Sequence, residues 1–287
     1  MNFTSVNGKN WKFKKFNSAD IKKYSEDFSL SEITAKLLAI RKNNIEDISL
    51  FLNPTIKNLL PNPLKLKDMK NAVERTYKCI EKDELIGIFG DYDVDGASST
   101  ALLARYFLSI KQKIKTYIPD RKKEGYGPST DAFNNLINLG AKIIFTVDCG
   151  TLSFGPIKTA QEHGVDIIVL DHHQSDIKLP NACAIVNPNR YDDTSKLNYL
   201  CAVGVCFVFL VALNKKLRDR NWFKEKKIKE PNILNFLDLV SLGTVCDVVP
   251  LIDLNRAIVT QGLKVLKKRL NLGLKTLYDL CKIESQP

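Results

Sequence analysis

The stretch LIGIFGDYDVDG, residues 85–96, joins an apolar run to a turn rich in acidic residues. Its first five residues have the length and composition of a buried strand, and helical periodicity follows from Ala97 to Ile110. The same order of strand, turn and helix recurs along the chain. The other expected strands are KIKTYI (113–118), KIIFTV (142–147), DIIVL (166–170) and CAIVN (183–187). This alternation predicts an α/β fold in which helices flank a parallel sheet.

The rest of the chain is predicted to be mostly helical. Start and stop signals indicate further helices over residues 128–139, 156–163, 198–216 and 232–242. Residues 1–84 are rich in Lys and Asn and contain amphipathic helical stretches, which predicts an N-terminal extension packed on the main domain. We therefore expect an extension over residues 1–84, an α/β domain over 85–254 and a helical segment over 255–287.

Composition excludes several classes of protein. The chain has 287 residues, of which 44% are apolar, and its 14 Gly and 11 Pro are too few for a collagen-like or low-complexity chain. The 43 Lys and Arg against 32 Asp and Glu give a formal net charge of +11, which is compatible with a polyanionic partner such as nucleic acid. For the basic stretch over residues 215–230, we favour a solvated face over a phosphate-contacting patch.

Cysteine usage and hydropathy indicate a cytoplasmic protein. The seven cysteines are odd in number and form no C-x-x-C pair, so neither a disulfide framework nor a zinc site is indicated. Residues 1–16 lack the apolar segment of a secretory signal. The longest apolar run, Leu200 to Leu213, is shorter than the ~20 residues of a membrane span, so we expect a buried helix and no membrane partner.

Acidic residues and histidines follow three of the expected strands. They occur in GDYDVDG (90–96), in DCG (148–150) and in DHH (171–173), and a further acid, Asp247, lies in GTVCDVVPL (243–251). Because ligands of parallel sheets bind at the carboxyl ends of the strands, these groups should meet. Each pair of carboxylates ~4 Å apart costs roughly 4 kcal/mol at an effective dielectric constant near 20. Divalent ions offset such repulsion, and the mixture of carboxylate and imidazole suits Mn²⁺ best, with Mg²⁺ as the second choice.

Other readings of these motifs are weaker. An EF-hand loop starting at Asp91 would need Glu at its twelfth position, where the chain has Leu102. Neither a P-loop nor a dinucleotide-binding glycine motif occurs. Only three histidines are present, and two of them, His172 and His173, are adjacent to Asp171, whereas His163 precedes a glycine that ends a helix. A capped turn with one hydrogen-bonded imidazole would explain the histidine pair taken alone. It does not explain why acids also follow the neighbouring strands.

In order and spacing, GDYDVDG, TVDCG, LDHHQ and GTVCDVVPL resemble the four motifs of the DHH phosphoesterase superfamily. DRKKEGYG, AIVNPNR and LCAVGVCF make the chain more similar to the RecJ-like exonucleases within it. The resemblance covers most of residues 85–270. It implies that LNRAIVTQGLKVLKKR lies on a helix that connects the DHH domain to a second, substrate-binding domain. Since the chain ends at Pro287, we expect it to lack that domain.

The resemblance also implies roles for individual residues. It implies two metal ions, with Asp148 as the bridging ligand. The implied metal ligands are Asp91, Asp93, Asp95, Asp148, His172 and Asp247. His173 would contact the scissile phosphate, and Asp171 would orient the histidines. Arg121 and Tyr126 match a loop that lies near the entering strand.

The function implied is metal-dependent, 5′→3′ exonucleolytic hydrolysis of single-stranded DNA in repair and recombination, by attack of a metal-activated water on phosphorus. Two alternatives stay open. One is a DHH phosphodiesterase that acts on short oligonucleotides or small nucleotides. The other is a non-catalytic nucleic-acid-binding module. The sequence leaves the oligomeric state open.

Overall fold

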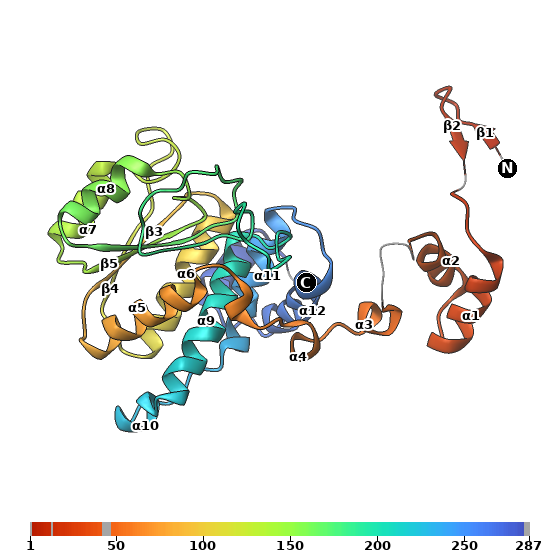
Figure 1. Cartoon of the computed structure of the whole chain (residues 1–287). Coiled ribbons are helices and arrows are strands. Elements are labelled where there is room, and N and C mark those ends of the chain that lie inside the picture. The colour runs from red at the N-terminus through yellow and green to blue at the C-terminus, as the bar shows by residue number, and fades with distance from the viewer. Residues whose placement is uncertain (1, 13, 42–46, 284–287) are drawn as a thin grey trace. The chain divides into compact units, whose positions relative to one another are not determined.

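A computed structural model describes residues 2–12, 14–41 and 47–283 of the chain. The chain divides into two compact units, Met1–Pro54 and Thr55–Pro287 (Figure 1). The first unit contains a hairpin and three helices, and the second contains the sheet and its covering helices. Helix α5 (Met69–Glu81) precedes residue 85 but belongs to the unit that contains the sheet.

The N-terminal unit has a small core of its own. Strands β1 (Asn2–Thr4) and β2 (Asn10–Lys12) pair antiparallel. Helix α1 (Ser18–Phe28) begins where the Asn17 side chain accepts a hydrogen bond from the Ala19 amide, which satisfies one of the free N–H groups of the first turn. Helices α2 (Glu32–Arg41) and α3 (Ile48–Leu52) complete the unit. Among the described residues, Tyr24, Ala35, Leu38 and Ala39 form its buried apolar cluster.

A five-stranded parallel sheet lies at the centre of the second unit, in the order β4-β3-β5-β6-β7. Its strands are β3 (Ile86–Gly90), β4 (Ile114–Tyr117), β5 (Ile143–Val147), β6 (Asp166–Leu170) and β7 (Ala184–Val186). The three central strands β3, β5 and β6 are buried almost throughout, as expected for a parallel sheet covered on both faces. The predicted α/β fold is confirmed, and each strand lies within its predicted range or one residue beyond it.

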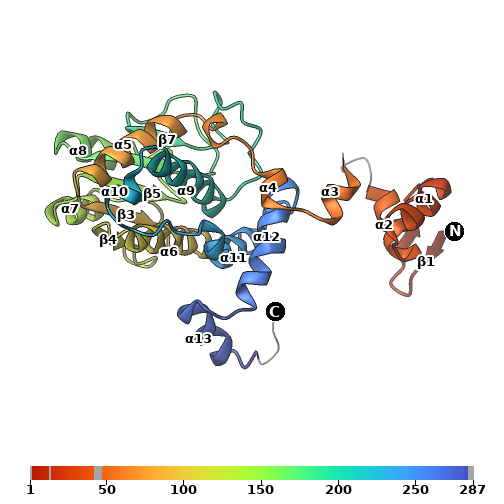
Figure 2. The same cartoon turned by 90° about the horizontal axis from the view of Figure 1, so that it is seen from below.

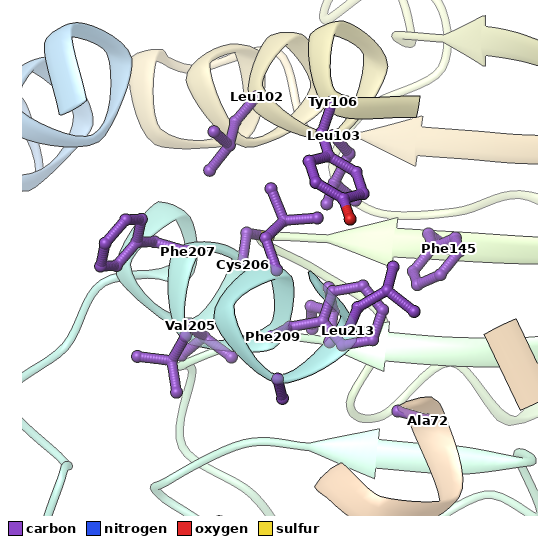
Figure 3. Packing of buried hydrophobic residues seen from close by; sticks show 14 of the residues in the cluster. Ala72, Leu102, Leu103, Tyr106, Phe145, Val205, Cys206, Phe207, Phe209 and Leu213 are labelled. Carbon is purple, nitrogen blue, oxygen red and sulfur yellow. The ribbon is translucent and has the colours of Figure 1, made fainter. Parts of the chain in front are cut away.

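Alternate strand residues enter two separate cores. Ile86, Phe145 and Leu170 pack in the larger core with helices α5, α6 (Val94–Ser109) and α9 (Ala202–Asp219). In the smaller core, Phe89 and Val169 pack with helices α7 (Thr130–Asn138) and α8 (Phe154–Glu162). Figure 1 shows these two helical layers on either side of the sheet, and Figure 2 shows the layer of α5, α6 and α9 from below. Phe145 of β5 contacts Phe209 of α9 in the larger core, with ring centroids 5.4 Å apart (Figure 3).

The remaining elements complete the second unit. These are α4 (Ile56–Leu59), η2 (Pro63–Lys65), α10 (Trp222–Glu225), η3 (Ile233–Phe236), α11 (Leu237–Cys246), α12 (Asp253–Leu266) and α13 (Leu272–Leu280). Helix α9 confirms the buried helix predicted over residues 200–213. Within the described residues, no helix has both the length and the apolar character needed to cross a membrane.

One helix end differs from the prediction. Helix α11 was expected to end near Leu242 but continues to Cys246, so that Asp247 is its C-cap. Gly243 does not have the left-handed φ of a glycine that ends a helix, and a Cβ there would come within 2.7 Å of Val203 Cγ1 and 2.9 Å of an Asp95 carboxylate oxygen. The glycine therefore serves close packing of α11 against α9 and α6 rather than termination.

Candidate metal centre

The carboxyl ends of β3, β5 and β6 are adjacent, because these strands are neighbours in a parallel sheet. Asp91 follows β3, Asp148 follows β5 and Asp171 follows β6, and all three are at most 2% exposed. The sheet therefore gathers three buried carboxylates at one edge, as the sequence predicted.

The first motif turns sharply from β3 into α6. The Asp93 side chain caps the helix by accepting the Gly96 amide at 2.8 Å. Asp95 points inward, and its two carboxylate oxygens accept the amides of Ala202 at 2.6 Å and Val203 at 2.9 Å, at the positive N-terminus of α9. A Cβ on Gly96 would come within 2.5 Å of the Asp91 carbonyl oxygen, so this turn requires glycine.

Asp148 and His172 form the centre of the site. Within the described residues, neither carboxylate oxygen of Asp148 has a hydrogen-bond partner, although the residue is only 1% exposed. The His172 Nε2 atom lies 3.2 Å from Asp148 Oδ1, 3.8 Å from Asp95 Oδ2 and 3.7 Å from Asp247 Oδ2. One imidazole nitrogen thus faces three carboxylates that come from three different elements.

Asp171 holds the histidine segment in place. One of its oxygens accepts the His172 amide at 2.7 Å and His173 Nδ1 at 2.8 Å, and the other accepts the Thr151 hydroxyl at 2.6 Å. Burial alone would raise the pKa of Asp171, but the hydrogen bond and charge of His173 outweigh it and lower the pKa to about 2. The same hydrogen bond raises the pKa of His173.

Asn187 and Asn189 also bind the histidine segment, and neither was expected from the sequence to belong to the site. Asn187 is fully buried, and its amide donates to the Thr151 hydroxyl and to the His173 carbonyl, both at 2.9 Å. The side-chain amide of Asn189 donates to the His172 carbonyl, and the backbone amide of Asn189 donates to Asn187 Oδ1. The available signal was a polar pair directly after a buried strand, in AIVNPNR.

Of the two loop residues, Tyr126 reaches the site more directly. Its hydroxyl donates to the Asp148 carbonyl at 3.3 Å and lies 3.2 Å from His173 Nε2. The Arg121 guanidinium lies 5.2 Å from the centroid of the Tyr92 ring, beside the first motif. Burial raises the pKa of Tyr126, so its hydroxyl stays protonated at neutral pH.

The pKa values of the clustered acids rise because the site is buried and negatively charged. Burial, followed by the charges of Asp95 and Asp93, raises the pKa of Asp148 to about 10. Burial raises the pKa of Asp95 to about 6 against the opposing effect of the Val203 amide, and it also raises the pKa values of Asp91 and Asp247. Without a compensating cation, it is unfavourable for all of these carboxyl groups to be ionised at the same time.

The donor atoms fall into three groups, each with ligand atoms within 4.8 Å of one another. The groups are Asp91–Asp93–Asp148, Asp148–His172–His173 and Asp95–Cys201–Asp247. All six residues expected to bind metal occur in these groups, and Asp148 belongs to two of them. The third group adds Cys201, which the sequence had placed among apolar thiols. The unpaired Asp148 oxygens and the oxygen and nitrogen donors fit divalent ions such as Mn²⁺ and Mg²⁺.

A family model, the N-terminal domain of the DHH family, matches residues 85–244. The chain belongs to the DHH family. It is 35% identical over 271 residues to the single-stranded-DNA-specific exonuclease RecJ of Bacillus subtilis, covering 94% of the chain and 32% of that protein. It is 38% identical over 237 residues to RecJ of Escherichia coli, covering 82% of the chain and 41% of that protein. The DHH chain thus spans about a third to two fifths of these relatives' length.

Solved structures agree with this assignment. A crystal structure of exonuclease RecJ bound to manganese has a TM-score of 0.65 at 30% identity, and covers 75% of the DHH chain and 52% of that structure. RecJ from Thermus thermophilus in complex with Mn²⁺ has a TM-score of 0.73 at 26% identity, and covers 93% of the DHH chain and 36% of that structure.

Proposed function

We propose that this chain hydrolyses phosphodiester bonds of single-stranded DNA as a metal-dependent 5′→3′ exonuclease. The observation that carries the proposal is the buried Asp148 carboxylate, which has no hydrogen-bond partner among the described residues and lies 3.2 Å from His172 Nε2, close to further acids. The substrate class is supported by the similarity to RecJ relatives named as single-stranded-DNA-specific. The net charge of +11 is compatible with a polyanionic substrate.

Two divalent ions fit the donor set, Mn²⁺ best and Mg²⁺ second. Asp91, Asp93 and Asp148 would hold one ion, and Asp148, His172, Asp95 and Asp247 the other. Such ions polarise phosphoryl oxygens and lower the pKa of water. A solved RecJ structure bound to manganese supports the choice of metal.

The chain's own residues would orient the phosphate. Asp171 fixes the His173 ring through the 2.8 Å hydrogen bond to Nδ1, which leaves Nε2 for a phosphate oxygen or the Tyr126 hydroxyl. The raised pKa of His173 favours the imidazolium, a cation suited to developing negative charge on phosphorus. Arg121, with its guanidinium over Tyr92, supplies a further cation for the entering strand.

The test compares a long single strand, the matching duplex and a dinucleotide in the presence of Mn²⁺, with 5′- and 3′-labelled ends. We expect hydrolysis of the single strand, with release of the 5′ label first. Preference for the dinucleotide would favour the small-substrate alternative, and the absence of hydrolysis with bound Mn²⁺ would favour a binding module. Because the cysteines described, among them the buried Cys206, are all free thiols, we place this activity in the reducing cytoplasm.

A further inference from the structure

A shallow groove of about 420 Å³ lies between the first turn of α6 and helix α11, next to the acidic cluster. Carbon atoms of Val94, Ala97, Leu239 and Leu242 form most of its lining, together with Tyr92. Val94, in the turn that carries the first motif, is 42% exposed. The mechanism proposed above makes no use of this surface.

The groove is continuous with the proposed metal centre. Asp93 lines the groove and is also one of the three carboxylates, with Asp91 and Asp148, whose oxygens lie within 4.8 Å of one another. Tyr92, the residue between Asp91 and Asp93, lines the groove and has the Arg121 guanidinium 5.2 Å from its ring centroid. A nucleotide with its phosphate at the carboxylates therefore has an apolar surface within reach of its base.

We propose that this groove receives the base of the nucleotide next to the scissile phosphate; the proposal rests on the single-strand nuclease function given above. A phosphate is a poor occupant, because the charged residue of the lining is Asp93. A base suits the groove, since its faces are apolar and stack on aromatic rings. The lining offers only the hydroxyl groups of Tyr92 and Ser98 beside that acid, so binding should depend little on base identity.

Ala97→Phe tests the proposal by filling the groove from a partly exposed helical position. We expect the KM for single-stranded DNA to rise about tenfold, the effect of losing one stacked base, with a smaller change in kcat. Leu242→Ala, which removes one wall of the groove, should raise the KM in the same direction. Leu108→Phe adds the same ring at a position that is 60% exposed near the other end of α6, and should match the wild type.

A substrate with a single abasic nucleotide next to the cleaved bond provides the second arm. For this substrate the wild type should have about the same raised KM as Ala97→Phe has for normal DNA. The KM of Ala97→Phe should differ little between the abasic substrate and normal DNA. If the wild type hydrolyses single-stranded DNA and the KM is unchanged in both Ala97→Phe and Leu242→Ala, the proposal that the groove receives a base is wrong. A wild-type chain that binds Mn²⁺ but hydrolyses no single strand instead overturns the function on which the groove rests.

Discussion

At the scale of single residues, Asp148 is buried and has a left-handed backbone with φ of 62°, and its carboxylate has no hydrogen-bond partner within the part of the chain that the structure describes. This backbone conformation costs about 1 kcal/mol in most residues but is tolerated by Asp and Asn. The turn directs the carboxylate toward His172 and the acids of the first motif. Burial of a carboxylate without hydrogen bonds is unfavourable for stability, and a cation that the carboxylate would bind accounts for it.

Asp148→Asn keeps the shape and the left-handed preference of the residue but removes its charge. We expect hydrolysis to fall by more than about 100-fold, because both proposed ions lose a shared ligand. Initial rates with single-stranded DNA and Mn²⁺ titration calorimetry measure the effect. A variant that keeps a tenth of the wild-type rate would contradict the bridging role.

Asn187→Asp tests the hydrogen bonds that hold the histidine segment in place. The change replaces the amide that donates to Thr151 and to the His173 carbonyl with an acceptor, so the histidine segment should shift. We expect a loss of about 10- to 100-fold in Mn²⁺ affinity or in rate. Asn138→Asp, an exposed position at the end of α7, is the matched control. Equal Mn²⁺ affinities and equal rates of hydrolysis in the two variants would show that Asn187 has no positioning role.

The residues expected to bind metal were easier to bring together from the sequence than the residues that hold them in place. Asp91, Asp148 and His172 follow apolar runs directly, so strand-end reasoning brings them together. Asn187 contributes through one amide that reaches two groups distant in sequence, and such a contact depends on the fold as a whole. Cys201 is close to Asp95 only because the N-terminus of α9 binds that carboxylate.

At the scale of elements, the turn from β3 into α6 positions most of the acids. The runs that form β3, β5 and β6 were predictable because buried parallel strands are continuously apolar. The end of α11 was not predictable in this way, because Gly243 resembles a helix stop in the sequence but in the structure makes a close contact with Asp95. The basic stretch over residues 215–230 includes the last turn of α9 and is anchored by the buried Trp222 and Phe223 of α10, and Arg218 pairs with Glu230 within it.

Gly96→Ala should disturb the turn. Its Cβ would meet backbone atoms of Asp91 at 2.5–2.8 Å, so either the strand end or the helix start must move. We expect a loss of about 1–3 kcal/mol in the free energy of unfolding, together with weaker Mn²⁺ binding.

Gly155→Ala in α8 is the control, because nothing lies within 4 Å of its added Cβ. Its stability should equal or exceed that of the wild type by up to about 1 kcal/mol. Urea denaturation of both variants gives the comparison. Equal stabilities would show that the turn adapts to a side chain at Gly96.

At the scale of the whole molecule, the net charge of +11 conceals a concentrated negative site. In the metal-free chain the pKa values of Asp148 and Asp95, about 10 and 6, lie above the ~3.9 of an unfolded Asp. The folded state therefore binds more protons than the unfolded state above about pH 4. Its stability falls as the pH rises through this window.

We accordingly expect the metal-free protein to melt at a higher temperature near pH 5 than near pH 8, by several degrees. Mn²⁺ should raise the Tm more at the higher pH, where its ligands lose their protons more readily. Thermal unfolding in chelator and in Mn²⁺, at both pH values, measures this. In Asp148→Asn the dependence on pH should be weaker, and a wild-type Tm without metal that is equal at both pH values would contradict the pKa assignments.

The acids of the site come from segments between Asp91 and Asp247, at the ends of β3, β5 and β6, at the start of α6 and at the end of α11. No short segment contains the full set, so the donors come together only after distant parts of the chain have paired. Of the two proposed ions, the one held by Asp95, Asp148, His172 and Asp247 would then gain its full set of ligands only after the sheet and α11 have assembled. During refolding, the arrival of this second Mn²⁺ would therefore mark the moment at which the long-range topology is complete.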